Sequence, residues 1–184
     1  MVQLVKKEEY KEMVAAYKRA TKQYYTLNIA LREIEGMIVC LSQTYDHKPT
    51  EDDKTALYQN HLSLLKINKV KDITLYDTTN AVNAFHLNGK EAWLPKADRV
   101  GLSNSIAIEK AAGIENTTLY LNGMALTIPV DTAIQMLSAL ELYALACYRK
   151  TEEHKINVNQ LSTIEEVESY DYTQGYPEKL NFEI

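Results

Sequence analysis

The chain has 184 residues, a formal net charge of −5 and 24% charged residues. A mildly acidic chain without a cluster of Lys and Arg has no electrostatic footprint for nucleic acid or for an anionic membrane, which argues against both partners. No apolar run approaches the roughly 20 residues of a membrane span, and the N-terminus lacks the apolar core of a signal peptide. We therefore expect no transmembrane segment, no signal peptide and synthesis in the cytoplasm.

The first part of the chain contains a heptad-like repeat of apolar and aromatic residues at alternating steps of three and four. This spacing is typical of the buried stripe of a long amphipathic helix, which we expect over residues 7–43. Two interpretations are open, an interface between proteins or an ordinary helical core. The stripe consists of Tyr10, Met13, Tyr17, Tyr24, Leu27, Leu31, Ile34, Ile38 and Leu41.

A second, shorter helix is expected over residues 51–70, with Thr50 as its N-cap after a break at Pro49. Packed against the first helix, it forms a helical hairpin or coiled coil that makes up residues 1–72. The shorter helix leaves part of the stripe uncovered, which favours a homo-oligomer.

From residue 73 the pattern changes to alternation of apolar and polar residues. Asn88-Gly89 and Asn122-Gly123 each lie between two alternating segments, which indicates β-hairpins because a type I′ turn needs positive φ at two successive residues. Two such hairpins predict a four-stranded antiparallel sheet with helices packed on one face. The expected fold is α+β, with an α+β domain over residues 73–184.

Three helices are expected in this domain. The first covers residues 95–112, and the second follows Pro129 with Asp131 as its N-cap. A short third helix begins at Ser162 or Thr163, and Thr163 matches a capping box with Glu166.

The C-terminal segment, residues 170–184, looks irregular and carries three tyrosines, Tyr170, Tyr172 and Tyr176. They are either a docking arm or part of a tail folded over its own domain.

No arrangement of catalytic or metal-binding residues stands out in the sequence. The histidines show no i, i+4 pair for zinc, and both cysteines lie in apolar stretches typical of buried free thiols. We expect no catalytic residue, no metal and no cofactor. The residues considered are His47, His61, His86, His154, Cys40 and Cys147.

Glu141 is the most unusual carboxylate, since it lies beside the apolar stripe of the helix after Pro129. We expect it to be partly buried and paired with Arg99 or Lys110. A structural ion pair is favoured over a catalytic acid at this position.

Three segments of the second half together resemble a known family. They are residues 82–102, with Trp93 and Arg99 six apart, residues 117–120 with their hairpin, and residues 133–154 with a following Thr-Ile-Glu-Glu-Val. Over about residues 74–180, this pattern resembles a domain of unknown function found in bacteriophage and prophage proteins, including tail-fibre and other virion-associated proteins. The family has no established activity, so it supplies no catalytic residues.

The resemblance implies a non-enzymatic structural protein of the virion, associated with the tail or tail fibre, whose partners are its own copies and other phage tail proteins. One alternative is a tail assembly chaperone or adaptor that is absent from the particle. Another is a small enzyme with a site near Trp93, Arg99 and Glu141.

Overall fold

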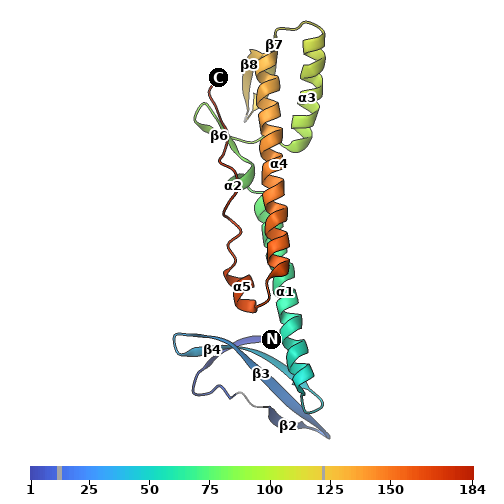
Figure 1. Cartoon of the computed structure of the whole chain (residues 1–184), viewed down its shortest axis with the longest axis vertical. Coiled ribbons are helices and arrows are strands. Elements are labelled where there is room, and N and C mark those ends of the chain that lie inside the picture. Colours follow the sequence, from blue (N-terminus) through green and yellow to red (C-terminus); the bar gives the residue numbers. More distant parts are fainter. Residues whose placement is uncertain (12–13, 122) are drawn as a thin grey trace. The chain divides into compact units, whose positions relative to one another are not determined.

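The computed structural model describes residues 1–11, 14–121 and 123–184 (Figure 1). The chain forms two compact units. Unit 1 comprises Met1–Asn68 and Leu161–Tyr170, and unit 2 comprises Lys69–Gln160 and Asp171–Ile184. The boundary that the sequence suggests after residue 72 falls inside helix α1 (Glu51–Asp77).

Unit 1 contains a four-stranded antiparallel sheet in the order β1-β4-β3-β2. The prediction of a helical hairpin or coiled coil over residues 1–72 is wrong, because the described residues before Pro49 form strands and turns and the first helix begins at Glu51. The strands are β1 (Val2–Lys6), β2 (Ala15–Arg19), β3 (Lys22–Ile34) and β4 (Met37–Tyr45).

A tight turn inside the predicted first helix explains why strands form instead. Glu35 and Gly36 have φ of 49° and 76° and join β3 to β4 through two residues. Positive φ at two successive positions is the geometry of a type I′ hairpin turn, and it ends any helix. The flanking strands are rich in β-branched and aromatic residues, which fit a pleated sheet.

A β-bulge accounts for the misleading heptad-like spacing. The register of β3 with β4 shifts between Ala30 and Arg32, so one extra residue enters β3 at this point. A bulge of this kind breaks the strict alternation of a strand. Leu27, Leu31 and Ile34 are therefore spaced by four and then three residues, as on a helix, although they lie on one strand.

One face of this sheet packs against the first turns of α1. Leu27, Ile29 and Leu41 form a buried cluster with Leu57 of α1. A neighbouring cluster joins Leu62 of α1 to helix α5 (Ile164–Ser169). These contacts fix which side of the sheet faces α1.

Helix α5 begins with the predicted capping box, which is confirmed. The Glu166 backbone N–H donates to Thr163 Oγ1 at 3.2 Å, and the Thr163 backbone N–H donates to Glu166 Oε2 at 3.0 Å. Two backbone donors of the first turn are thereby satisfied.

In unit 2 both predicted hairpins are confirmed. Strands β5 (Phe85–Leu87) and β6 (Lys90–Ala92) flank Asn88-Gly89, whose φ values are 49° and 73°. Strand β7 (Asn116–Leu121) pairs with β8 (Met124–Pro129), and Asn122 in their turn lies outside the described residues.

The prediction that these two hairpins form one four-stranded sheet is wrong. The short strand β9 (Asn181–Phe182) pairs in parallel with β5, which gives a separate three-stranded sheet in the order β6-β5-β9. Because β5 has a neighbour on each side, it offers no free edge to β7 or β8. The four-stranded sheet of this protein lies in unit 1 instead.

Helices α3 (Lys96–Ala111) and α4 (Val130–Gln160) pack against each other in unit 2 (Figure 1). Both were expected, but Asp131 is not the N-cap, because α4 already begins at Val130. Asp131 lies in the first turn and pairs with Lys110 at 2.8 Å. A short helix, α2 (Asn80–Asn83), precedes β5. The main buried residues include Phe85, Ile106, Leu119, Leu121 and Leu137.

Among the described residues, α4 is the one helix that is long and apolar enough for a membrane span by length and composition. This is weak evidence, since core helices meet the same test. Ten residues of α4 are buried within the protein.

Candidate functional site

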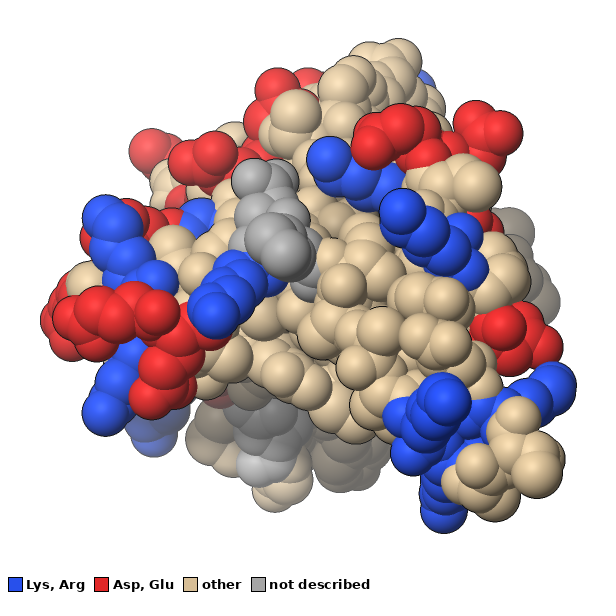
Figure 2. Space-filling view, turned by 90° about the horizontal axis from the view of Figure 1, so that it is seen from below, with Lys and Arg blue, Asp and Glu red and all other residues tan. Residues whose placement is uncertain are grey.

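The side of the unit 1 sheet that faces away from α1 has an uncharged central part, and Arg19 and Lys22 lie on the same side at one end of β2 and β3. Successive side chains on a strand point to opposite faces, so the neighbours of the buried Leu27, Ile29 and Leu41 form this second side. Figure 2 shows a broad tan area with Lys, Arg, Asp and Glu around its margins. We name the uncharged central part of this side the outer sheet face, and the strand register assigns to it Ala15, Tyr17, Tyr24, Thr26, Asn28, Ala30, Cys40, Ser42 and Thr44.

Two contacts hold side chains of the outer sheet face in place. The rings of Tyr17 and Tyr24 stack with their centroids 5.6 Å apart. Ser42 Oγ donates a hydrogen bond to Asn28 Oδ1 at 2.5 Å. The face therefore presents ordered aromatic and small polar groups. The sequence signal that marks it is alternation within residues 24–30, which the heptad interpretation obscured.

The residues predicted as a helical seam are distributed over the sheet. Leu27 and Leu41 are core residues, Ile38 is buried, Leu31 packs beside the core, and Ile34 is 45% exposed. Tyr17, Tyr24 and Ile38 lie on the side of the sheet that faces away from α1. Tyr10 lies between β1 and β2, and Met13 lies outside the described residues.

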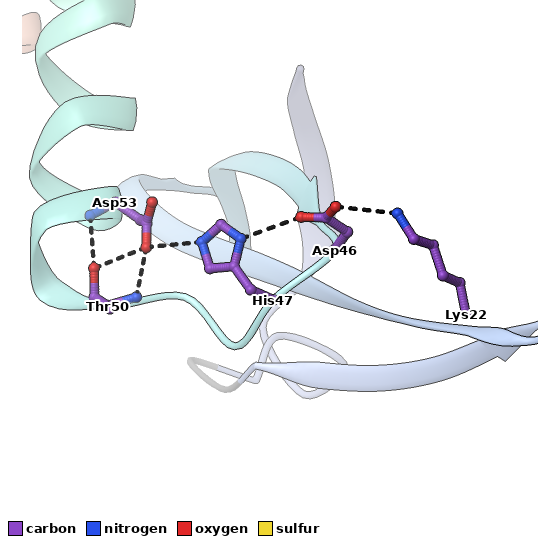
Figure 3. A network of polar contacts seen from close by, with 5 residues as sticks. All are labelled: Lys22, Asp46, His47, Thr50 and Asp53. Carbon is purple, nitrogen blue, oxygen red and sulfur yellow. Dashed lines mark hydrogen bonds and ion pairs between the residues drawn. The ribbon is translucent and has the colours of Figure 1, made fainter.

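A chain of polar contacts orders the connection between β4 and α1 (Figure 3). Lys22 Nζ donates to Asp46 Oδ2 at 3.3 Å, and His47 lies between two carboxylates, 3.2 Å from Asp46 Oδ1 and 3.3 Å from Asp53 Oδ2. The Asp53 backbone N–H donates to Thr50 Oγ1 at 3.2 Å, so the predicted N-cap is confirmed.

These contacts shift the pKa values of the exposed groups in the chain. Hydrogen bonds to Asp46 and then to Asp53 raise the pKa of His47 above its usual value. The backbone N–H of Thr50 is the main cause that lowers the pKa of Asp53. Opposite charges in contact favour the charged form of each partner.

We expect Asp53→Asn to lower the pKa of His47, because one of its two anionic partners is lost. Since the folded-state pKa of His47 is raised, its stabilising contribution is complete below pH 6.5 and is lost as the pH rises through the folded-state pKa. Proton NMR of the His47 ring across a pH series measures the shift. The matched control is Asp52→Asn, the exposed neighbour, and an equal effect of both variants contradicts the assignment.

A groove of about 580 Å³ lies beside α4 in unit 2. Glu141, Ala144, Leu145 and Tyr148 line it from one stripe of α4, at positions i, i+3, i+4 and i+7 of the helix. Its volume lies within the range of roughly 300–1,000 Å³ that is typical of ligand sites.

The structure brings Arg99 and Glu141 together at one end of the groove. Arg99 Nε donates to Glu141 Oε1 at 2.7 Å, and Arg99 Nη1 donates to the Leu94 carbonyl at 2.8 Å. The Arg99 side chain is 10% exposed and that of Glu141 is 40% exposed. Lys110, the alternative partner from the sequence, pairs with Asp131 instead.

Trp93 and Lys96 line the groove near this pair. Trp93 is half-buried and is the single tryptophan of the chain. Lys96 opens α3, and it forms no ion pair with any residue that the structure describes. The groove thus presents an indole ring and an ammonium group beside Arg99.

Asp77 lies at the other end of the groove. Thr151 Oγ1 donates to Asp77 Oδ1 at 2.6 Å, and the hydroxyl of Tyr176 lies 3.0 Å from Thr151 Oγ1. Burial raises the pKa of Tyr176. Asp77 is therefore held by neutral hydroxyl groups, and it forms no ion pair with a Lys or Arg of the described residues.

The thiol of Cys147 also borders the groove but is unsuited to nucleophilic attack. Burial raises its pKa, which keeps it protonated. The neighbouring Tyr143 donates its hydroxyl to the Val82 carbonyl at 2.7 Å, and burial raises its pKa as well. Both groups belong to a structural cluster around Val82.

The C-terminal segment of unit 2 is folded back on that unit. The rings of Tyr172 and Tyr176 each contact Tyr76 edge to face, at 5.7 Å and 5.6 Å between centroids. His154 is buried and lies 2.9 Å from the Gln174 carbonyl. Of the two interpretations from the sequence, these tyrosines fit the folded tail.

Within residues 1–11, 14–121 and 123–184, no group of three or more His, Cys, Asp and Glu side chains is arranged to hold a metal ion. Comparison with known proteins gives no matching family model, no matching curated protein and no matching solved structure.

Proposed function

We propose that this chain is a non-enzymatic protein of a bacteriophage or prophage, a tail or tail-fibre associated component of the virion that acts through protein–protein contacts. The resemblance over about residues 74–180 supplies the phage setting. The observation that carries the contact role is the outer sheet face of unit 1.

The composition of the outer sheet face fits an interface better than a solvated surface. Along each strand of a half-buried antiparallel sheet, apolar residues that face the core normally alternate with polar and charged residues that face water. Here 24% of the chain is charged, yet the nine residues of the outer sheet face include no charge, and the charged Arg19 and Lys22 lie at its end. Interface centres are depleted in charged residues and enriched in tyrosine, which Tyr17 and Tyr24 provide.

The edge of the same sheet supports contact with a second copy. All five residues of β2 are exposed, and β2 pairs with β3 alone among the described strands. An open strand edge presents unpaired backbone donors and acceptors that a second strand can use. Antiparallel pairing of β2 with β2 of a second copy satisfies two-fold symmetry, so we propose a homo-oligomer joined at this edge.

Charge on the outer sheet face is expected to dissociate the assembly. The double variant Tyr17→Glu with Thr44→Glu places two carboxylates on exposed positions of this face. Light scattering across a concentration series should then give the mass of one chain, 21.0 kDa, where the parent protein gives a multiple. The matched control is Asn60→Glu on the exposed side of α1, and a parent protein that is itself monomeric contradicts the homo-oligomer.

Mass spectrometry of purified phage particles tests the place of the protein in the virion. Its presence in stoichiometric amount supports the structural component. Absence from the particle, together with co-purification with a tail protein from infected cells, supports an assembly chaperone or adaptor instead.

A small enzyme is the second candidate, because the groove of unit 2 is concave and contains Trp93, Arg99 and Glu141. The carboxylate of Glu141 accepts from Arg99 at 2.7 Å, so its charge is engaged in a structural pair. This arrangement is better suited to binding a ligand than to proton transfer.

A further inference from the structure

The groove of unit 2 has a cationic end and an anionic end on either side of an apolar floor. Arg99 contacts Glu141, whereas Asp77 contacts Thr151, ten residues further along α4. At 1.5 Å per residue these two positions are separated by about 15 Å. Ala144 and Leu145 line the groove between them.

The cationic end retains hydrogen-bond donors for a ligand. Arg99 uses Nε for Glu141 and Nη1 for the Leu94 carbonyl, while its Nη2 makes no hydrogen bond within the described part of the chain. Nη2 is also accessible to solvent, since it is not one of the buried polar atoms that lack a hydrogen-bond partner. Lys96 adds a second cationic donor from the first turn of α3, where the helix dipole also favours an anion.

We propose that this groove binds the carboxyl end of a partner chain whose last residue is aromatic or apolar. The terminal carboxylate binds Arg99 Nη2 and Lys96 Nζ, and the last side chain lies against Trp93 and the apolar floor. Arginine and lysine pair well with carboxylates, and indole offers a large apolar surface.

The length of the groove and the charge of Asp77 specify a second feature of the ligand. An extended chain spans about 3.3–3.6 Å per residue, so about 15 Å corresponds to four or five residues. A basic side chain about four residues before the carboxyl end therefore reaches Asp77. The remaining polar lining groups are neutral, apart from Glu141, which is paired with Arg99.

This inference goes beyond the proposed function, because it concerns unit 2 and requires no contact through the outer sheet face. Either proposal can fail without the other, since one is tested by solution mass and the other by peptide binding.

Trp93 provides a direct readout because it is the single tryptophan of the chain and lines the groove. The probe is the acetylated pentapeptide Lys-Ala-Ala-Ala-Phe with a free carboxylate, titrated into the full-length protein while Trp93 emission is followed. We expect saturable binding, at least tenfold weaker for the same peptide with a C-terminal amide. Acetyl-phenylalanine alone should bind at least tenfold more weakly too, since it cannot reach Asp77.

Variants assign the two ends of the groove. Lys96→Gln should weaken the acid peptide about tenfold, which corresponds to about 1.4 kcal/mol, and leave the amide unchanged. The matched control is Lys71→Gln, an exposed lysine of α1 outside the groove lining. Asp77→Asn keeps an acceptor for Thr151 and should abolish the preference for lysine over norleucine at the first peptide position.

Three outcomes overturn the proposal. They are no saturable change in Trp93 emission, equal binding of the acid and the amide, and equal binding of acetyl-phenylalanine and the pentapeptide. The last result identifies a site for a small carboxylic acid rather than for a chain end.

Discussion

Phe85→Ala is expected to lower the free energy of unfolding of unit 2 by about 3–5 kcal/mol, the usual cost of emptying a large aromatic position in a core. The side chain of Phe85 is 1% exposed and contacts Phe182 edge to face with 5.8 Å between ring centroids. Its loss removes packing at the place where β5 meets β9. Urea unfolding followed by Trp93 emission measures the change, because that residue lies in unit 2.

The control for this prediction is Ile108→Ala in the same unit. The side chain of Ile108 is 70% exposed on α3, so its truncation should change stability by less than about 0.5 kcal/mol. A loss below about 1.5 kcal/mol for the Phe85 variant is inconsistent with a packed core at this position.

Arg99→Met should cost about 2–4 kcal/mol, clearly more than Glu141→Gln at about 1 kcal/mol. The asymmetry follows from burial, since Arg99 is 10% exposed and Glu141 is 40% exposed. Without Arg99, the Leu94 carbonyl loses its buried donor. Glutamine at position 141 still offers an oxygen to Arg99 Nε, and the exposed part of that side chain remains hydrated.

The matched control for the buried pair is Lys110→Met. Lys110 pairs with Asp131 at 2.8 Å, but the two side chains are 59% and 69% exposed, so the loss should be below about 1 kcal/mol. Equal losses for Lys110→Met and Arg99→Met in thermal and urea unfolding are inconsistent with a buried role for Arg99.

The turns and helix caps could be predicted from the sequence, whereas the spacing of apolar residues in the first 45 residues was wrongly interpreted as helical. Asn88-Gly89 and the Thr163–Glu166 capping box act within a few residues, so their sequence signals suffice. Gly36 carried the equivalent turn signal between β3 and β4. The bulge in β3, however, gives the apolar residues just before this turn the spacing of a helix.

The candidate site was only partly accessible from the sequence. Glu141 beside an apolar stripe suggested the ion pair with Arg99, which is formed. The groove itself depends on Asp77, Trp93 and Tyr148, which come together only when distant elements pack. No local pattern reports such proximity, and the outer sheet face depends in the same way on the pairing of β2, β3 and β4.

The pairing of β9 with β5 also sets an order of events during synthesis. The Asn88 backbone N–H donates to the Phe182 carbonyl at 2.8 Å, and the Ile184 backbone N–H donates to Asn88 Oδ1, 96 residues away in the chain. At roughly 5–20 residues per second, the ribosome needs about 5–20 s to make the intervening chain. During that interval the hydrogen-bonding edge of β5 is unprotected on the nascent chain, so unit 2 can complete its sheet only after β9 has emerged.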